Sequence, residues 1–197
     1  LDNILTGNNA ANRLTGGAGS DTYVIGAGDS IVESVNAGID SVQTSVTHTL
    51  AANVENLTLT GTATINGTGN GLNNILIGNS AVNTLTGGAG NDTYIVGTGD
   101  TVVEALNAGT DTVQSAVTWS LGANVENLVL VGSAAVNGTG NTLANVLTGN
   151  AGNNALVGGD GNDTMAGGQG NDVRNGGTGD DVSQVAAILV EILLHVG

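Results

Sequence analysis

The feature that most constrains this chain is a long internal repeat, in which residues 72–142 copy residues 1–71. The two segments match at roughly 45 of 71 positions without a gap, and a third, partial unit runs from residue 143 to about residue 184. Self-similarity at a fixed period indicates that each unit packs on its neighbours, not around one central core. We therefore expect a single repeat array over residues 1–184, followed by a different segment over residues 185–197.

A shorter period of about nine residues lies inside each unit. Gly and Asn precede a short apolar or β-branched segment in each nine-residue step, which predicts one turn and one strand per step. Helices are excluded over residues 1–180 because Gly recurs too often, with 34 in the chain. The positions expected to face the interior in the first unit and at the start of the second are Leu5, Leu14, Tyr23, Val32, Val42, Leu50, Leu59 and Leu76.

Two such steps form one coil of about 18 residues with a strand on each face. The predicted fold is therefore all-β, a right-handed parallel β-roll or β-helix solenoid with about four coils in each full repeat unit. The composition agrees, because 40% of the residues are hydrophobic but only 2% are aromatic and none is Phe. Such a chain can fill a narrow interior with small side chains but cannot build a thick core.

The charge balance excludes several classes of partner. The formal net charge is -15, and Arg13 and Arg174 are the only basic residues. Nothing here could neutralise a phosphate backbone or an anionic membrane surface, so we expect no nucleic acid and no membrane partner. A chain this acidic attracts cations, and with no Cys it has neither disulfides nor thiolate metal sites. It shows no N-terminal signal and opens at Leu1, so we expect it to be part of a longer protein.

One nonapeptide motif carries the predicted chemistry. The pattern is GGxGxDxUx, where U is a large apolar residue, and its fullest matches start at Gly16, Gly87, Gly158, Gly167 and Gly176, the last two with Arg174 and Ser183 at U. Glycines let a turn fold so that several carbonyl oxygens converge, and the Asp adds a carboxylate at the end of the turn. Ca²⁺ takes six to eight such hard oxygen ligands, so one turn supplies half of a site and the turn stacked on it supplies the rest.

The register predicts which turns pair. Two steps after Gly16 the sequence VNAGIDSVQ keeps an Asp in the same place, so Asp21 should face Asp40. The same arithmetic pairs Asp92 with Asp111 and Asp163 with Asp181. On the opposite edge, Asp172 should lie over Asn154 and form a poorer half-site.

These motifs resemble the RTX (haemolysin-type) calcium-binding repeat family over residues 1 to about 184. The resemblance implies that backbone carbonyls of the paired turns complete each calcium shell. It nominates Gly16, Ala18, Asn36 and Gly38 in the first unit, and their equivalents Gly87, Ala89, Asn107, Gly109, Gly158, Asp160, Gly177 and Gly179. It also implies a secreted, extracellular protein that crosses a type I secretion apparatus unfolded and folds on Ca²⁺ outside the cell.

The other polar residues favour structural roles. Asp29 and Asp100 sit one position early in their steps and are predicted to bond their own turns, and Glu55 and Glu126 are predicted to satisfy turn amides. His48, replaced by Trp119 in the next unit, is predicted to be a surface or edge residue. Asn in the Asp position is expected to form amide ladders between coils, at Asn3, Asn12, Asn74, Asn83, Asn145 and Asn154.

The C-terminal segment, residues 185–197, breaks the repeat. It is apolar almost all round, with helical spacing at Val185, Ile188, Leu189, Ile192 and Val196, and it is too short for a confident membrane span. Three interpretations stay open: a cap over the last coil, a self-association surface, or, by family resemblance, an uncleaved type I export signal.

The sequence therefore predicts a non-enzymatic calcium-binding module, because no catalytic triad, zinc motif or phosphate loop is present. Two alternatives share its calcium chemistry. One is an adhesin or surface-layer solenoid whose Thr-rich strands bind a glycan or ice. The other is the non-catalytic C-terminal part of a secreted lipase or metalloprotease.

Overall fold

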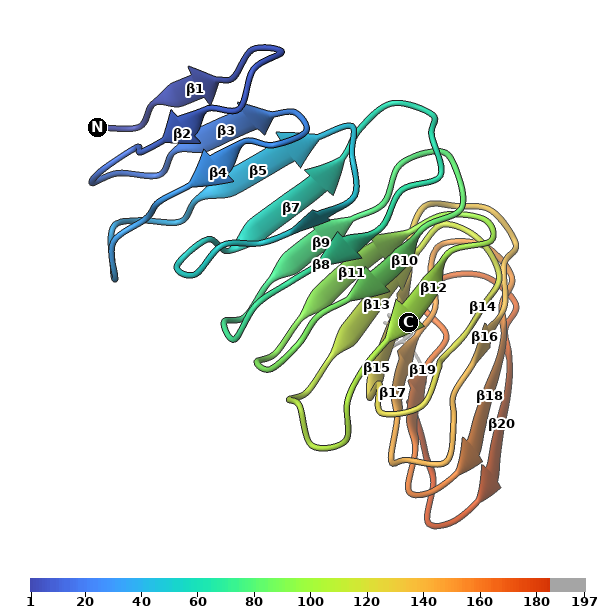
Figure 1. The fold of residues 1–197 in the computed structure, drawn as a ribbon. Coiled ribbons are helices and arrows are strands. Elements are labelled where there is room, and N and C mark those ends of the chain that lie inside the picture. Colours follow the sequence, from blue (N-terminus) through green and yellow to red (C-terminus); the bar gives the residue numbers. More distant parts are fainter. Residues whose placement is uncertain (185–197) are drawn as a thin grey trace, which may run out of the picture.

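The computed structural model describes residues 1–184 as a parallel β-solenoid, and these residues contain no helix. One face is an 11-stranded parallel sheet formed by the odd-numbered strands (Figure 1). Its strands, in spatial order, are β1 (Ile4–Thr6), β3 (Thr22–Ile25), β5 (Ser41–Thr44), β7 (Asn56–Leu59), β9 (Ile75–Ile77), β11 (Thr93–Val96), β13 (Thr112–Ser115), β15 (Asn127–Leu130), β17 (Val146–Thr148), β19 (Thr164–Ala166) and β21 (Val182–Gln184).

The opposite face is divided into three smaller parallel sheets. The first pairs β2 (Arg13–Leu14) with β4 (Ser30–Ile31). The second contains β6 (His48–Thr49), β8 (Gly67–Thr68), β10 (Thr84–Thr86) and β12 (Thr101–Val103). The third contains β14 (Trp119–Ser120), β16 (Gly138–Thr139), β18 (Ala155–Asp160) and β20 (Val173–Thr178).

The strand register fixes the length of each coil. In the first unit Leu5 pairs with Tyr23, Tyr23 with Val42, Val42 with Leu57 and Leu57 with Leu76, so the step from Val42 to Leu57 is the short one. The second unit repeats the same four steps, with the short one from Val113 to Leu128. The prediction of four coils per unit is confirmed, but the predicted coil length is only an average, because one coil in four is shorter than the rest.

The interior is a narrow core of apolar side chains stacked coil on coil. The large sheet contributes a column in which every member is 0–1% exposed, namely Tyr23, Val42, Leu57, Leu76, Tyr94, Val113, Leu128, Leu147 and Met165. Gly67 of β8 faces this column, and a Cβ there would lie 2.9 Å from a methyl carbon of Leu57. The interior is therefore too narrow for side chains on both faces of every coil.

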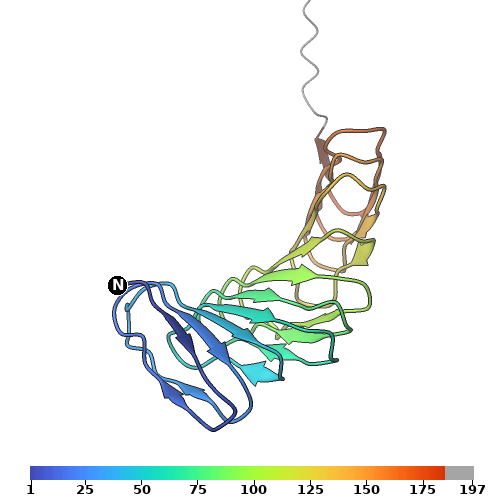
Figure 2. The same cartoon turned by 90° about the horizontal axis from the view of Figure 1, so that it is seen from above.

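The smaller face is interrupted where the coil shortens. The breaks fall between β4 and β6 and between β12 and β14, and β6 and β14 both lie in the short coils. Figure 2 shows that the solenoid bends along its length and is not a straight stack. The large sheet runs unbroken through both short coils, so it is the continuous element that carries the turns considered below.

One predicted core position is wrong. Val32 is 37% exposed, whereas Ile31 is buried and pairs with Leu14, so the register in this coil is shifted by one residue. Residues 185–197, with their predicted cap, self-association surface or export signal, lie outside the described residues. Within residues 1–184, no helix is long and apolar enough to cross a membrane.

Candidate metal centre

The predicted aspartate pairs lie on stacked turns at the edge of the large sheet. The backbone N–H of Asp21 donates to Oδ1 of Asp40 at 2.7 Å. The N–H of Asp92 donates to Oδ1 of Asp111 at 2.8 Å, and that of Asp163 donates to Oδ1 of Asp181 at 3.0 Å. In each pair the backbone N–H of the first Asp donates to the carboxylate of the second Asp, on the next coil. This bond places the two side chains one above the other.

The turn that leads into each lower Asp is shaped by glycine. A Cβ on Gly16 would lie 2.1 Å from Oδ2 of Asp21, so only glycine leaves room for the carboxylate to fold back over the turn. The next residue, Gly17, has φ of 90°. In the upper turn Asn36 takes the corresponding left-handed conformation, with φ of 57°, which Asn tolerates better than most residues.

The backbone groups nominated from the motif lie on these stacked turns. A Cβ on Gly38 would lie 2.1 Å from the Gly19 carbonyl oxygen, and one on Gly177 would lie 1.9 Å from that of Gly159, so the turns are in close contact. The Ala18 carbonyl accepts a hydrogen bond from the Leu1 amino group at 2.6 Å. The structure brings the nominated turns together, and the assignment of individual carbonyls as ligands stays a prediction.

In five of the six paired aspartates the second oxygen is buried and has no hydrogen-bond partner within the described residues. Both members of the first two pairs, together with Asp163, are 0–1% exposed, and in each the Oδ2 atom is buried without a hydrogen bond. A buried carboxylate oxygen left unpaired is costly, and native structures rarely tolerate one without an ion or water. Neither Arg13 nor Arg174, the only basic residues, belongs to these pairs.

The electrostatics of the second pair reflect this lack of counter-charge. Burial raises the pKa of Asp92 to about 6, with a further rise from the nearby charge of Asp111. Burial likewise raises the pKa values of Asp40, Asp111 and Asp163, and the neighbouring carboxylate adds to each rise. Ionising these carboxylates therefore costs free energy, which a bound cation would offset.

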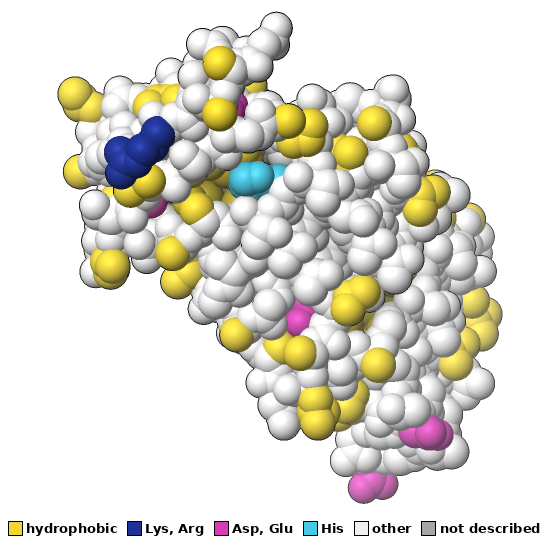
Figure 3. Space-filling view, viewed as in Figure 1, with side chains coloured by type: hydrophobic (Ala, Val, Ile, Leu, Met, Phe, Trp, Pro, Cys, Tyr) yellow, Lys and Arg dark blue, Asp and Glu magenta, His cyan; other side chains and the backbone are white. Residues whose placement is uncertain are grey.

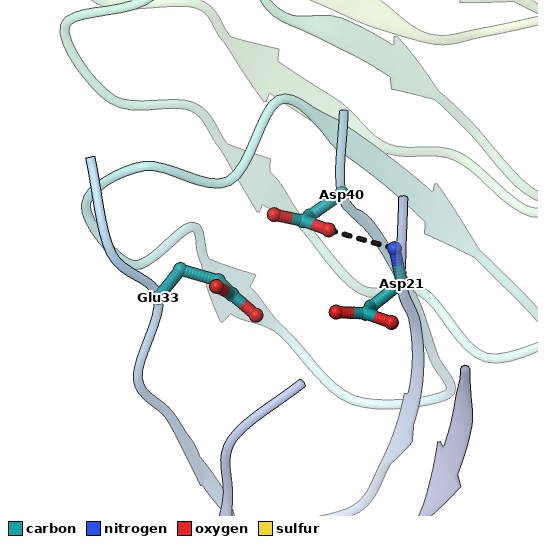
Figure 4. Close-up of side chains that lie close together, drawn as sticks. All are labelled: Asp21, Glu33 and Asp40. Carbon is teal, nitrogen blue, oxygen red and sulfur yellow. Dashed lines mark hydrogen bonds between the residues drawn. The ribbon is translucent and has the colours of Figure 1, made fainter. Parts of the chain in front are cut away.

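The structure adds a third carboxylate that the sequence analysis missed. Glu33 lies with Asp21 and Asp40, and Glu104 with Asp92 and Asp111, and each trio offers carboxylate oxygens within 4.8 Å of one another. Figure 4 shows the Glu33 carboxylate pointing toward the aspartate pair. Burial first, and then the charges of Asp111 and Asp92, raise the pKa of Glu104 to about 7. The signal in the sequence was their recurrence at equivalent positions of the first two repeat units, in the same place relative to the first Asp.

The half-site on the opposite edge is different. The N–H of Asn154 donates to Oδ1 of Asp172 at 2.9 Å, which confirms the predicted stacking. A Cβ on Gly167 would lie 2.2 Å from Oδ2 of Asp172 and 2.6 Å from Nη1 of Arg174, so a guanidinium shares the space beside this carboxylate. We therefore expect a metal ion to bind more weakly at Asp172 than at the three paired sites.

The acidic residues interpreted as structural do bond their turns. Asp100 accepts the N–H of Gly97 at 2.7 Å with Oδ2 and the N–H of Asn83 at 2.8 Å with Oδ1, and Asp29 makes the equivalent two bonds. Glu55 accepts the N–H of Asp40 at 2.7 Å, and Glu126 accepts that of Asp111 at 2.8 Å. Asp100 and Asp29 therefore close their own turns, and neither belongs to a cluster of carboxylates that could share a metal ion within the described residues.

The Asn residues are bonded, but not as the predicted amide ladders. Asn74 donates from Nδ2 to the carbonyls of Val54 and Glu55, and Asn145 does the same to Val125 and Glu126. Each side chain therefore bridges to the backbone of the neighbouring coil and not to the amide stacked on it.

His48 is half-buried and lies on β6, an edge strand of its sheet, which agrees with the predicted surface or edge position. Its Nε2 atom is buried without a partner among the described residues, and burial lowers its pKa. Trp119, at the same place in the next unit, is 9% exposed and its Nε1 atom is also unpartnered there. Both side chains stack beside a glycine of the next coil, Gly67 and Gly138, which makes room for them.

A comparison with known protein families identifies the family of this chain. The sequence model of the RTX calcium-binding nonapeptide repeat (4 copies) matches residues 1–32, 68–103 and 139–173. The chain belongs to this family. No curated protein and no solved structure matches the chain.

The residues present fit the calcium ion that RTX repeats bind. The paired turns offer carboxylates and backbone carbonyls, and neither Cys nor His lies in the trios. An all-oxygen set suits a hard cation such as Ca²⁺, and the unpartnered Oδ2 atoms are the groups that such an ion would satisfy. Most of these carboxylates are turned inward, and Figure 3 shows Asp and Glu in only a few small spots on the visible face.

Proposed function

We propose that this chain is a calcium-dependent folding module of a secreted protein, and that it carries no catalytic activity of its own. The observation that carries the proposal is the set of five buried aspartates, Asp21, Asp40, Asp92, Asp111 and Asp163, whose Oδ2 atoms have no hydrogen bond in the described structure. Bound Ca²⁺ would supply the missing charge at each pair, held by Asp21 and Asp40, by Asp92 and Asp111, and by Asp163 and Asp181.

The metal would decide whether the chain folds. The interior is a narrow apolar core, and the 34 glycines lose much conformational entropy when they are ordered. Binding to the folded state alone contributes about 2.7 kcal/mol per site at a hundredfold excess of ligand over Kd. Three sites would contribute roughly 8 kcal/mol, which is as large as the whole stability of an ordinary domain.

This coupling supports an extracellular location. Extracellular calcium modules bind with Kd values of about 0.1–1 mM, so the chain would be unfolded in a cytosol poor in Ca²⁺ and folded outside. An unfolded chain can pass a type I secretion apparatus, and folding on calcium would then hold it outside the cell.

The large sheet gives no support to the ice-binding alternative. One outward-facing column of the large sheet runs Thr22, Ser41, Asn56, Ile75 and Thr93, so its hydroxyl groups are interrupted. As part of a lipase or metalloprotease, the module would keep the same calcium chemistry.

Calorimetric titration tests the proposal. We expect the chain to bind about three Ca²⁺ ions with Kd near about 0.1–1 mM, with Mg²⁺ binding much more weakly because it needs a rigid octahedral shell. A triple variant, Asp21→Asn, Asp92→Asn and Asp163→Asn, should abolish binding, whereas the turn variants Asp29→Asn and Asp100→Asn should preserve it. Absence of calcium binding by the unaltered chain at about 10 mM, roughly ten times the upper Kd, would refute the proposal.

A further inference from the structure

Glu33 and Glu104 stand where the repeat departs from its family pattern. The first two matched segments end at residues 32 and 103, one residue before each glutamate. The register of β4 on β2 sets Glu33 over Gly16, the first residue of the turn below. On this edge the step from Asp21 to Asp40 is 19 residues. On the opposite edge the step from Asn12 to Asp29 is 17 residues. The turn that ends at Asp40 is therefore longer than the turn that ends at Asp21. Glu33 is the first residue of this longer turn.

Several oxygens converge on the first glycine of each site. A Cβ on Gly87 would lie 2.1 Å from Oδ2 of Asp92, 2.1 Å from the Tyr94 hydroxyl and 2.3 Å from Oε1 of Glu104. The Tyr94 hydroxyl donates a hydrogen bond to Oε1 of Glu104, and Tyr23 donates in the same way to Glu33. The other oxygen of Glu104 accepts the N–H of Ala105 at 3.2 Å. The glutamate is therefore fixed in orientation and buried, with 8% exposure.

The aspartates beside the glutamates supply a second observation that points to a ligand. Asp92 and Asp111 are 1% and 0% exposed, and their unpartnered Oδ2 atoms belong to the trio in which Glu104 lies. Three buried carboxylates within 4.8 Å of one another, with no basic residue in the trio, repel one another unless a cation lies between them.

The third site lacks both features. Gly176 stacks on Gly158, because Val157 pairs with Asn175 and Gly159 with Gly177. The tyrosine position is taken by Met165, and Asp163 and Asp181 are 18 residues apart, without the longer turn. The chain therefore contains two sites with three carboxylates and one with two.

We propose that Glu33 and Glu104 are calcium ligands, each adding a third carboxylate to an aspartate pair, so that the first two sites bind Ca²⁺ more tightly than the third. This inference rests on the proposed calcium function and specifies its ligands. Tyr23 and Tyr94 are positioning residues, because they hold the glutamates toward the aspartates without being needed as ligands. Calcium affinity rises with the number of charged ligands, which gives the order of the sites.

The tyrosines also provide the assay. The chain has two Tyr residues, one in each three-carboxylate site, so ¹³C-labelled tyrosine gives one NMR reporter per site. Ca²⁺ is titrated into the full chain and into Glu104→Gln, which keeps the shape and the acceptor for Tyr94 but removes the charge. Glu33→Gln is the mirror variant. Asp180→Asn removes the same charge from an exposed position and is the matched control.

We expect Glu104→Gln to raise the calcium midpoint of the Tyr94 signal by at least about tenfold, the loss typical when a group that supports a metal site is removed. Glu33→Gln should do the same for Tyr23, and Asp180→Asn should move neither signal. If folding is cooperative along the solenoid, both tyrosine signals shift together in each glutamate variant. The comparison with the midpoint of Asp180→Asn then still shows whether the glutamate contributes to calcium binding. Midpoints equal to that control in both glutamate variants would overturn the inference. Failure of the unaltered chain to respond to calcium would instead overturn the proposed function.

Discussion

The loss of stability in Asp92→Asn should depend on calcium, whereas the loss in Asp100→Asn should not, although both residues lie in neighbouring glycine-rich turns. Asp92 has one oxygen bonded to the Asn74 N–H at 2.6 Å and one buried oxygen without a partner in residues 1–184. Both oxygens of Asp100 accept backbone N–H groups. Asp92 therefore has an oxygen available to bind an ion, whereas Asp100 uses both oxygens to close its turn.

The magnitudes follow from these contacts. In Asp92→Asn the amide oxygen can keep the bond to Asn74, but one calcium site is lost, which costs about 2.7 kcal/mol at a hundredfold excess of Ca²⁺ over Kd. Without metal the same variant should be as stable as the unaltered chain or more so, because a buried and uncompensated charge has been removed. Asp100→Asn leaves one turn N–H facing an amide N–H, which costs about 1–3 kcal/mol with or without calcium.

Calorimetry counts the bound ions, and urea unfolding at several calcium concentrations measures the stability of each variant. Asp92→Asn should bind one ion fewer and lose stability by an amount that grows with the calcium concentration. Asp100→Asn should bind the full number and lose about 1–3 kcal/mol at every calcium concentration at which the chain folds. An unchanged ion count in Asp92→Asn, or a site lost in Asp100→Asn, would show that the nine-residue register does not identify the ligands.

Three further outcomes are expected. Asp92 and Glu104 have pKa values raised from 3.8 and 4.5 to about 6 and about 7, so their contribution to stability is complete below about pH 4 and is lost as the pH rises through 6 to 7. In EDTA the chain should therefore keep more β structure in circular dichroism at pH 5 than at pH 8, whereas in excess Ca²⁺ the melting temperature should be higher at pH 8, because protons compete with the metal; the same order in both conditions would contradict it. Gly87→Ala should abolish the second site, since its Cβ would lie 2.1 Å from Oδ2 of Asp92, and calorimetry should count one ion fewer. Leu147→Ala should cost about 2–5 kcal/mol in urea unfolding at saturating calcium, because Leu147 is 0% exposed in the apolar column.

The repeat made much of this structure predictable. The long repeat interval fixes which turns recur, and the spacing between turns of the same edge was enough to stack Asp21 on Asp40 and its two equivalents. Glycine in the motif predicted turns for a physical reason, because the backbone must approach the carboxylate closely at Gly16.

The departures from the regular period were not predictable in the same way. The short step from Val42 to Leu57 is seen in the strand register, and the nine-residue period does not predict it. The register shift that buries Ile31 instead of Val32 also brings Glu33 into line with Gly16, so the third carboxylate was missed for the same reason. A nine-residue template assigns Glu33 no role, and only the three-dimensional stacking shows its neighbours.

Far-UV circular dichroism during a calcium titration, followed by excess EDTA, tests the central claim most directly. If the buried aspartate pairs need a cation, the metal-free chain at pH 8 should give a coil spectrum, and Ca²⁺ should convert it to β structure with a midpoint of about 0.1–1 mM that EDTA reverses. Mg²⁺ at the same concentration is the control and should leave the coil spectrum largely unchanged. A full β spectrum that persists in EDTA at pH 8 would show that the apolar column alone holds the solenoid together, and that calcium does not control its folding.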